Sequence, residues 1–142
     1  MNEEEHAFNQ RNIAEFRATG GRISAFGDAP VLLLTTVGAK SGAPRTNPLM
    51  YLADDDAPNR VYVFASAGGA DKNPGWFYNV VADPAGLTVE IGDEKVPAEA
   101  EILPEPQREE IYAVQESRFP NFRAYREGTS RTIPVVALTL RR

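Results

Sequence analysis

Cysteine is absent from this 142-residue sequence, and histidine occurs only once, at His6. Without cysteine the chain forms no disulfide, offers no thiolate nucleophile and builds no cysteine metal site. A single histidine near the N-terminus also argues against a Ser-His-Asp triad or a two-histidine metal centre, so we predict no metal site. Any redox chemistry carried out by this chain therefore requires an external cofactor.

Long hydrophobic runs are missing too, because no apolar stretch approaches the roughly 20 residues that a membrane span needs. The first residues are acidic rather than apolar, which is not the pattern of a signal peptide. We therefore expect a cytoplasmic protein without an integral membrane segment. The net charge of −5 argues against nucleic acid as a partner. The length predicts a single domain, residues 1–142.

The hydrophobic pattern predicts strands and helices without regular βαβ alternation. The segment 31–37 is apolar or β-branched throughout, which indicates a strand buried on both faces. Pro97 favours an edge position for the strand at 96–102. The predicted fold class is mixed α+β: about six mostly antiparallel strands closing into a barrel, with flanking helices and a peripheral N-terminal helix within residues 1–22. The expected strands are 31–37, 46–52, 61–65, 87–91, 96–102 and 133–140, and the expected helices are 3–19, 74–82 and 104–117, followed by a short helical turn at 119–126.

Two cations and a hydroxyl gather in the turn between the first two strands. Gly38, Gly42 and Pro44 punctuate this turn, which carries Lys40, Ser41 and Arg45. Exposed backbone N–H groups together with a point charge and a planar guanidinium can hold an anion. The spacing is not that of a Walker loop, and no helix follows. From local spacing alone, a charged and solvated hairpin turn is the favoured interpretation.

A second glycine-rich loop, residues 66–71, follows the predicted strand at 61–65 and precedes a helix. We expect Asn73 to cap that helix and Pro74 to occupy its first position. A glycine loop that leads into a helix N-terminus is a second candidate site for an anion or a flat ring.

The C-terminal segment 118–142 is basic within an acidic protein, since it holds six arginines against one glutamate, a net charge of +5. This segment is either a solvated helix face and tail or a further anion-binding surface.

Taken together, the runs LLTTVGAKSGAPRTNPLMY, ASAGGADKNPGWFYNV and YREGTSRTIPVV resemble the deazaflavin-dependent nitroreductase family, whose members include quinone reductases. The resemblance covers about residues 31–140. These actinobacterial proteins have an FMN-binding split-barrel fold. The resemblance implies an oxidoreductase that uses coenzyme F-420, an 8-hydroxy-5-deazaflavin with a phosphate and an oligoglutamate tail. The implied partner is a small-molecule electron acceptor such as a quinone, an enone or a nitroaromatic, and the implied assembly is a homodimer.

The resemblance also assigns roles to individual residues. The KSGxxR motif grips the phosphate side of the coenzyme, the loop after the strand at 61–65 lines the ring, and the KNPxW motif completes the site. Tyr125 and Ser66 are the hydroxyls expected to bind the acceptor during catalysis. The implied cofactor-binding residues are Lys40, Ser41, Gly42, Pro44, Arg45, Asn47, Ala65, Ser66, Ala67, Gly68, Lys72, Asn73 and Trp76. Two alternatives remain open: an FMN-dependent oxidoreductase of the same fold, for which FMN is the less favoured cofactor, and a non-catalytic deazaflavin carrier.

Overall fold

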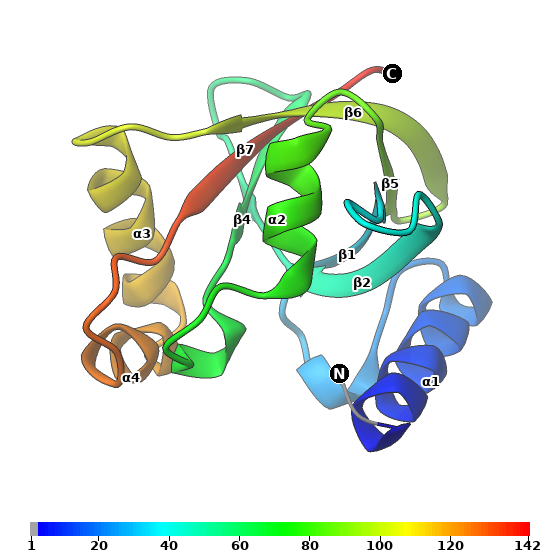
Figure 1. Ribbon diagram of the computed structural model, residues 1–142, viewed down its shortest axis with the longest axis horizontal. Coiled ribbons are helices and arrows are strands. Elements are labelled where there is room, and N and C mark those ends of the chain that lie inside the picture. Colours follow the sequence, from blue (N-terminus) through cyan, green and yellow to red (C-terminus); the bar gives the residue numbers. More distant parts are fainter. Residues whose placement is uncertain (1–2) are drawn as a thin grey trace.

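In the computed structural model, which describes residues 3–142, seven strands form one curled antiparallel sheet flanked by helices (Figure 1). The sheet order is β2-β1-β5-β6-β7-β4-β3. This arrangement confirms the expected split-barrel fold class. The strands are β1 (Val31–Val37), β2 (Pro44–Met50), β3 (Leu52–Ala53), β4 (Arg60–Phe64), β5 (Leu87–Ile91), β6 (Glu94–Ile102) and β7 (Val135–Leu140). The helices are α1 (Glu3–Thr19), α2 (Gly75–Ala82), α3 (Gln107–Arg118) and α4 (Asn121–Glu127), with short 3-10 turns η1 (Ser24–Phe26) and η2 (Ala67–Gly69).

The number of strands differs from the prediction because the segment 46–52 serves two edges of the sheet. β2 pairs with β1 at one edge, whereas β3 pairs with β4 at the other. Only Tyr51 separates them, and its backbone N–H donates a 3.1 Å hydrogen bond to the carbonyl of Pro30. Adjacent residues can lie on opposite edges only if the sheet curls until those edges approach each other, which explains the half-barrel.

The first strand is buried on both faces, as its unbroken apolar run predicts. Successive side chains of a strand point to opposite sides. Leu32 and Leu34 therefore pack with Trp76 of α2, whereas Leu33 packs on the other face in a cluster with Phe16 of α1. Burying each such leucine stabilises the fold by about 1.5–3 kcal/mol. β1 thus packs against α2 on one face and against α1 on the other.

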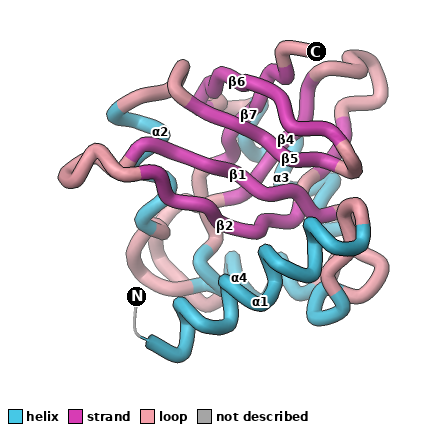
Figure 2. The backbone as a smooth tube through the Cα atoms, turned by 90° about the vertical axis from the view of Figure 1, so that its right-hand side faces the viewer, coloured by secondary structure: helices cyan, strands magenta, loops and turns pink. Residues whose placement is uncertain are grey.

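The N-terminal helix begins and ends where the sequence predicts, and it crosses the outer side of the sheet next to β2 (Figure 2). Its apolar stripe is sparse, yet Ile13 and Phe16 are both buried. Arg17 adds a bidentate ion pair with Glu90, with both N–O distances at 3.0 Å. The peripheral segment expected at 1–22 is therefore anchored to the sheet, although its residues 1 and 2 lie outside the described part of the chain.

The edge position expected for Pro97 is wrong, because β6 lies between β5 and β7. The carbonyl of Pro97 accepts a 2.9 Å hydrogen bond from the backbone N–H of Arg141, one residue beyond the end of β7. The nitrogen of a strand residue points to the same side as its carbonyl. The side of Pro97 that lacks an N–H therefore faces the chain just beyond the end of β7. For this reason Pro97 can lie in an internal strand.

Within residues 3–142, no helix combines the length and the hydrophobicity that crossing a membrane requires. The same part of the chain contains no group of three metal-ligating side chains arranged to hold an ion.

Candidate functional site

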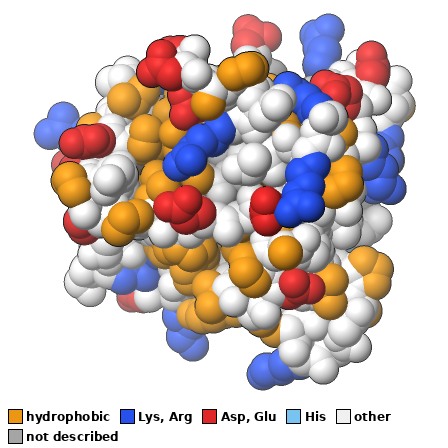
Figure 3. All heavy atoms as spheres, turned by 90° about the horizontal axis from the view of Figure 1, so that it is seen from above, with side chains coloured by type: hydrophobic (Ala, Val, Ile, Leu, Met, Phe, Trp, Pro, Cys, Tyr) orange, Lys and Arg blue, Asp and Glu red, His pale blue; other side chains and the backbone are white. Residues whose placement is uncertain are grey.

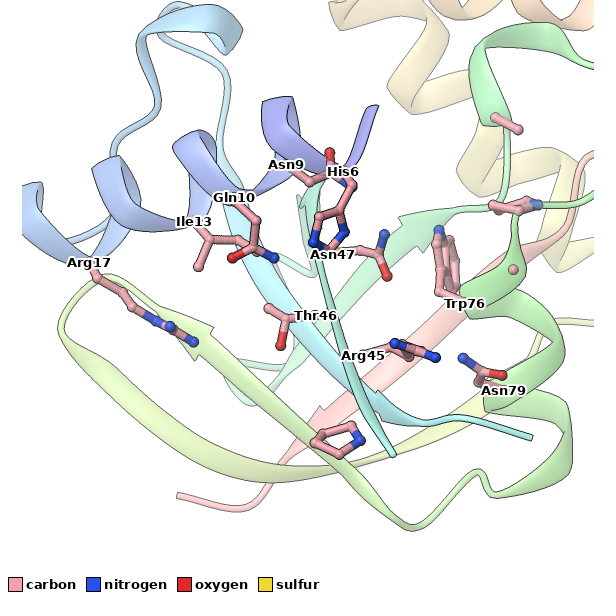
Figure 4. Close-up of a pocket in the computed structure, with 14 residues that line it drawn as sticks. His6, Asn9, Gln10, Ile13, Arg17, Arg45, Thr46, Asn47, Trp76 and Asn79 are labelled. Carbon is pink, nitrogen blue, oxygen red and sulfur yellow. The ribbon is translucent and has the colours of Figure 1, made fainter. Parts of the chain in front are cut away.

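A cavity of about 1050 Å³ lies between α1, β2, η2 and the N-terminal end of α2 (Figure 4). Five of the expected cofactor-binding residues line it, and they come from segments well separated in sequence. These are Pro44, Arg45, Asn47, Ala67 and Trp76. The remaining lining residues were not expected from the sequence: His6, Asn9, Gln10, Ile13, Arg17, Thr46, Pro74, Gly75 and Asn79.

The charge of this cavity is its main chemical feature. Of the described residues that line it, two are arginines and none is Asp or Glu, in a protein whose net charge is −5. Arg17 is neutralised by Glu90, and the hydrogen bonds to that carboxylate raise the pKa of Arg17. Arg45 has no acidic or hydrogen-bonding partner among residues 3–142. The cavity therefore presents one uncompensated guanidinium, which suits an anionic ligand.

The turn that precedes Arg45 is closed by its own backbone. The N–H of Gly38 donates to the carbonyl of Ala43, and the N–H of Gly42 donates to the carbonyl of Gly38, both at 2.8 Å. Gly42 has φ of +71°, a conformation that glycine adopts without strain. The Ser41 hydroxyl accepts a 3.1 Å bond from Ala43. Lys40, Ser41 and Gly42 thus shape the turn but do not line the cavity.

Asn79 holds this turn against α2. Its amide oxygen accepts a 2.9 Å hydrogen bond from the backbone of Ala39, and its amide nitrogen donates a 3.1 Å bond to the hydroxyl of Thr36. Figure 4 shows Asn79 with Trp76 and Arg45 on the α2 side of the cavity. Sequence reasoning missed this residue, although its position three residues after Trp76 places both on one face of a helix.

The loop between β4 and α2 is held by Arg131, which donates hydrogen bonds to it from all three of its side-chain nitrogens. One of these bonds, 2.7 Å long, goes to the amide oxygen of Asn73. The expected helix cap is therefore wrong: Pro74 is the N-cap, without a side-chain hydrogen bond, and the Asn73 side chain is engaged elsewhere. Of the expected ring-lining residues here, only Ala67 reaches the cavity wall. Ala65 is buried, Ser66 is half-buried, and Gly68 and Lys72 are exposed.

Tyr125 lines a second cavity of about 520 Å³, apart from the other expected site residues. Its neighbours there include Phe26, Met50 and Phe119. The Tyr125 hydroxyl accepts a 2.9 Å hydrogen bond from the side-chain nitrogen of Asn121. β2 contributes to both cavities, and η2 lines the first while touching the backbone of Tyr125, so the two are neighbours.

The face of α1 that borders the larger cavity is polar. The α1 residues that line the cavity are spaced three or four apart along one helix face: His6, Asn9, Gln10, Ile13 and Arg17. That spacing is visible in the sequence, but the hydrophobic pattern predicts only a peripheral helix here and assigns no cavity to it.

The basic C-terminal segment is internally compensated, which favours a solvated and ion-paired surface over a further anion site. Apart from the exposed Arg118, its arginines bind groups of the protein itself. The pairs are Arg123–Glu127, Arg126–Glu109, Arg141–Glu99 and Arg142–Glu94, and Arg131 binds the loop before α2. On the upper face, where β6 and the C-terminus lie, basic side chains sit beside acidic ones (Figure 3).

Comparison with known proteins identifies the family of this chain. The profile of the F420H(2)-dependent quinone reductase family matches residues 8–140. The chain belongs to this family. It is 38% identical over 135 residues to the F420H(2)-dependent quinone reductase Rv1261c of Mycobacterium tuberculosis (strain H37Rv), covering 90% of this chain and 87% of that protein. The resemblance carried by the KSGAPR and KNPGW motifs is thereby confirmed.

Solved structures of family relatives have the same architecture. An F420-H2 dependent reductase, FDR-A, superposes with a TM-score of 0.67 at 35% identity, over 77% of this chain and 93% of that one. A domain-swapped dimer superposes with a TM-score of 0.69 at 33% identity, over 90% of this chain and 95% of that one. These likenesses confirm the split-barrel fold.

Proposed function

We propose that this chain is an oxidoreductase that uses reduced coenzyme F420 to transfer hydride to a quinone-type acceptor. Family membership supports the coenzyme. The single observation that carries the proposal to particular residues is the large cavity, where, among the described residues, Arg45 stands without an acidic partner and none of the lining residues is a carboxylate.

The residues of the larger cavity fit a phosphorylated, flat coenzyme. Arg45 can bind a phosphate with two parallel N–H bonds, and Lys40 on the adjoining turn adds a second cation. Thr46 and Asn47 offer polar side chains on the same strand. Trp76, only 5% exposed, provides a rigid aromatic wall. The coenzyme, when bound there, supplies the hydride.

The smaller cavity fits the acceptor. It is mostly apolar, it adjoins the coenzyme cavity, and Tyr125 reaches into it. Because the Tyr125 hydroxyl accepts its bond from Asn121, its own proton remains available for an acceptor oxygen on which negative charge develops. We propose Ser66 as a second donor, because its hydroxyl has no partner among residues 3–142, although it lines neither cavity. Phe26 and Phe119 exclude water from this side.

We also propose that the chain acts as a homodimer. The support is the related structure described as a domain-swapped dimer, which covers nearly the whole of this chain. Size-exclusion chromatography with light scattering tests this point directly, and a monomeric mass at working concentrations would refute it.

The proposed function is tested by titrating the purified protein with F420 and with FMN, followed by turnover. Trp76 is the sole tryptophan and lines the cavity, so its fluorescence reports occupancy. We expect tight binding of F420 and reduction of menadione by the reduced coenzyme, with FMN a poor substitute. FMN-dependent turnover without deazaflavin activity would refute the choice of coenzyme. Binding of F420 without reduction of any acceptor in a broad panel would establish a carrier instead.

A further inference from the structure

Arg131 makes an unusual set of contacts with the loop 65–73, which borders the larger cavity at Ala67 and packs against α4 at Gly69. Its Nε donates to the carbonyl of Ala70 at 2.8 Å, and its Nη1 donates to the amide oxygen of Asn73 at 2.7 Å. Its Nη2 donates to the carbonyls of Ala65 at 3.1 Å and Ser66 at 2.9 Å. One planar side chain thus bonds acceptors spread over residues 65–73.

This loop needs an external constraint. Three consecutive residues, Ala67, Gly68 and Gly69, have positive φ values of 48°, 63° and 86°. Such a conformation is strained for alanine and persists only where the surrounding structure determines it. The buried carbonyl of Ala65 also requires a donor, whereas the carbonyl of Ser66 already accepts a 2.9 Å hydrogen bond from the N–H of Gly69. The Arg131 guanidinium meets both needs, because its N–H groups have fixed relative directions.

The same residue connects the loop to the segment that carries Tyr125. The backbone N–H of Arg131 donates to the hydroxyl of Thr129 at 3.3 Å, and that hydroxyl in turn donates to Asp71 at 3.1 Å. A Cβ added to Gly69 would lie 3.1 Å from the Cα of Tyr125, so the loop and α4 are in close contact. Ser66 and Tyr125 therefore belong to one connected unit.

We propose that Arg131 is a positioning residue for hydride transfer, an inference that rests on the proposed function. Arg131 lines neither cavity, and no carboxylate among the described residues forms an ion pair with it. Its hydrogen bonds hold the loop 65–73 so that Ala67 borders the proposed coenzyme cavity and Gly69 stays packed against α4, which carries Tyr125 into the acceptor cavity. Lysine cannot reproduce this arrangement, since it presents a single ammonium in place of a planar fork.

The test compares Arg131→Ala and Arg131→Lys with the control Arg123→Ala, whose arginine is exposed and pairs only with Glu127. We expect both Arg131 variants to lose turnover by roughly 10- to 100-fold, the scale of a displaced catalytic group. Hydrogen exchange at amides 66–73 should accelerate in both variants and stay unchanged in Arg123→Ala. Millimolar guanidinium should restore turnover and slow exchange in Arg131→Ala alone.

Two results would overturn the inference: turnover and exchange equal to those of Arg123→Ala, or a loss in both variants that guanidinium does not reverse and that follows global unfolding. If the unsubstituted protein reduces no acceptor, the proposed function fails, but the exchange and rescue measurements still decide whether Arg131 holds the loop.

Discussion

Replacing Arg45 with glutamine removes the one uncompensated guanidinium that the described residues place in the proposed coenzyme cavity, while keeping a shorter, uncharged polar side chain. Arg45 is exposed and has no partner among residues 3–142. The free energy of unfolding should therefore change by no more than about 0.5 kcal/mol, the usual range for such surface positions. The substitution isolates ligand binding from folding.

The expected effect on coenzyme affinity is large. A hydrogen bond to a charged group contributes about 1.5–3 kcal/mol, which corresponds to a roughly 10- to 150-fold increase in the dissociation constant. Because Arg45 faces water, part of this contribution should be screened as the ionic strength rises. The ratio of the F420 dissociation constants of Arg45→Gln and the unsubstituted protein should therefore become smaller at high salt.

Titration of F420 monitored by Trp76 fluorescence measures this dissociation constant, with calorimetry as a second method. Arg123→Gln is the matched control, since it removes an exposed arginine remote from the proposed contacts. Equal affinities for Arg45→Gln and the unsubstituted protein, or equal losses in the two arginine variants, would show that Arg45 does not hold the coenzyme.

Three further predictions concern turnover and stability. Tyr125→Phe should lower the turnover rate while leaving the F420 dissociation constant unchanged, because it removes a hydroxyl offered only to the acceptor; unchanged rates with several acceptors would leave Tyr125 a packing role. Gly69→Ala should lower the unfolding free energy in urea by more than Gly92→Ala, since both positions have positive φ but only the Cβ at Gly69 meets neighbouring backbone. The Tyr62 hydroxyl lowers the pKa of Asp54, so Asp54→Asn should destabilise the fold at neutral pH. The difference in unfolding free energy from the unsubstituted protein should begin to shrink as pH falls below about 4, the unfolded value, and disappear below the lower pKa of the folded state; a constant difference would contradict this.

The buried elements were predictable because their patterns are local. The strands at 31–37 and 87–91 match their predicted limits, since the first is an unbroken apolar or β-branched run and the second stops at the turn residue Gly92. The division at Tyr51 was not predictable, because the residues on either side look equally extended. Which partner each half pairs with depends on the curvature of the whole sheet.

The residues of the candidate site also fall into two groups, those that short motifs predict and those that they do not. Arg45, Asn47 and Trp76 could be selected from short motifs, and they meet in one cavity. Asn79 and Arg131 could not, because their bonds reach across 43 and 65 positions of sequence to Thr36 and Ser66. Polar residues that organise a loop from a distance leave no periodic signal.

The two free edges of the curled sheet, β2 and β3, meet at Tyr51, so a ligand bound beside this meeting point should stabilise both edges. The coenzyme cavity takes part of its wall from the edge strand β2 and part from the turn that follows β4, the neighbour of the opposite edge strand β3. A ligand bound in this cavity would contact both margins of the seam between the two edges. Ligand at 100 times its dissociation constant stabilises a folded protein by about 2.7 kcal/mol. That gain should be visible first as slower hydrogen exchange along the two margins of the seam, β2 and β3, rather than in the buried strand β1.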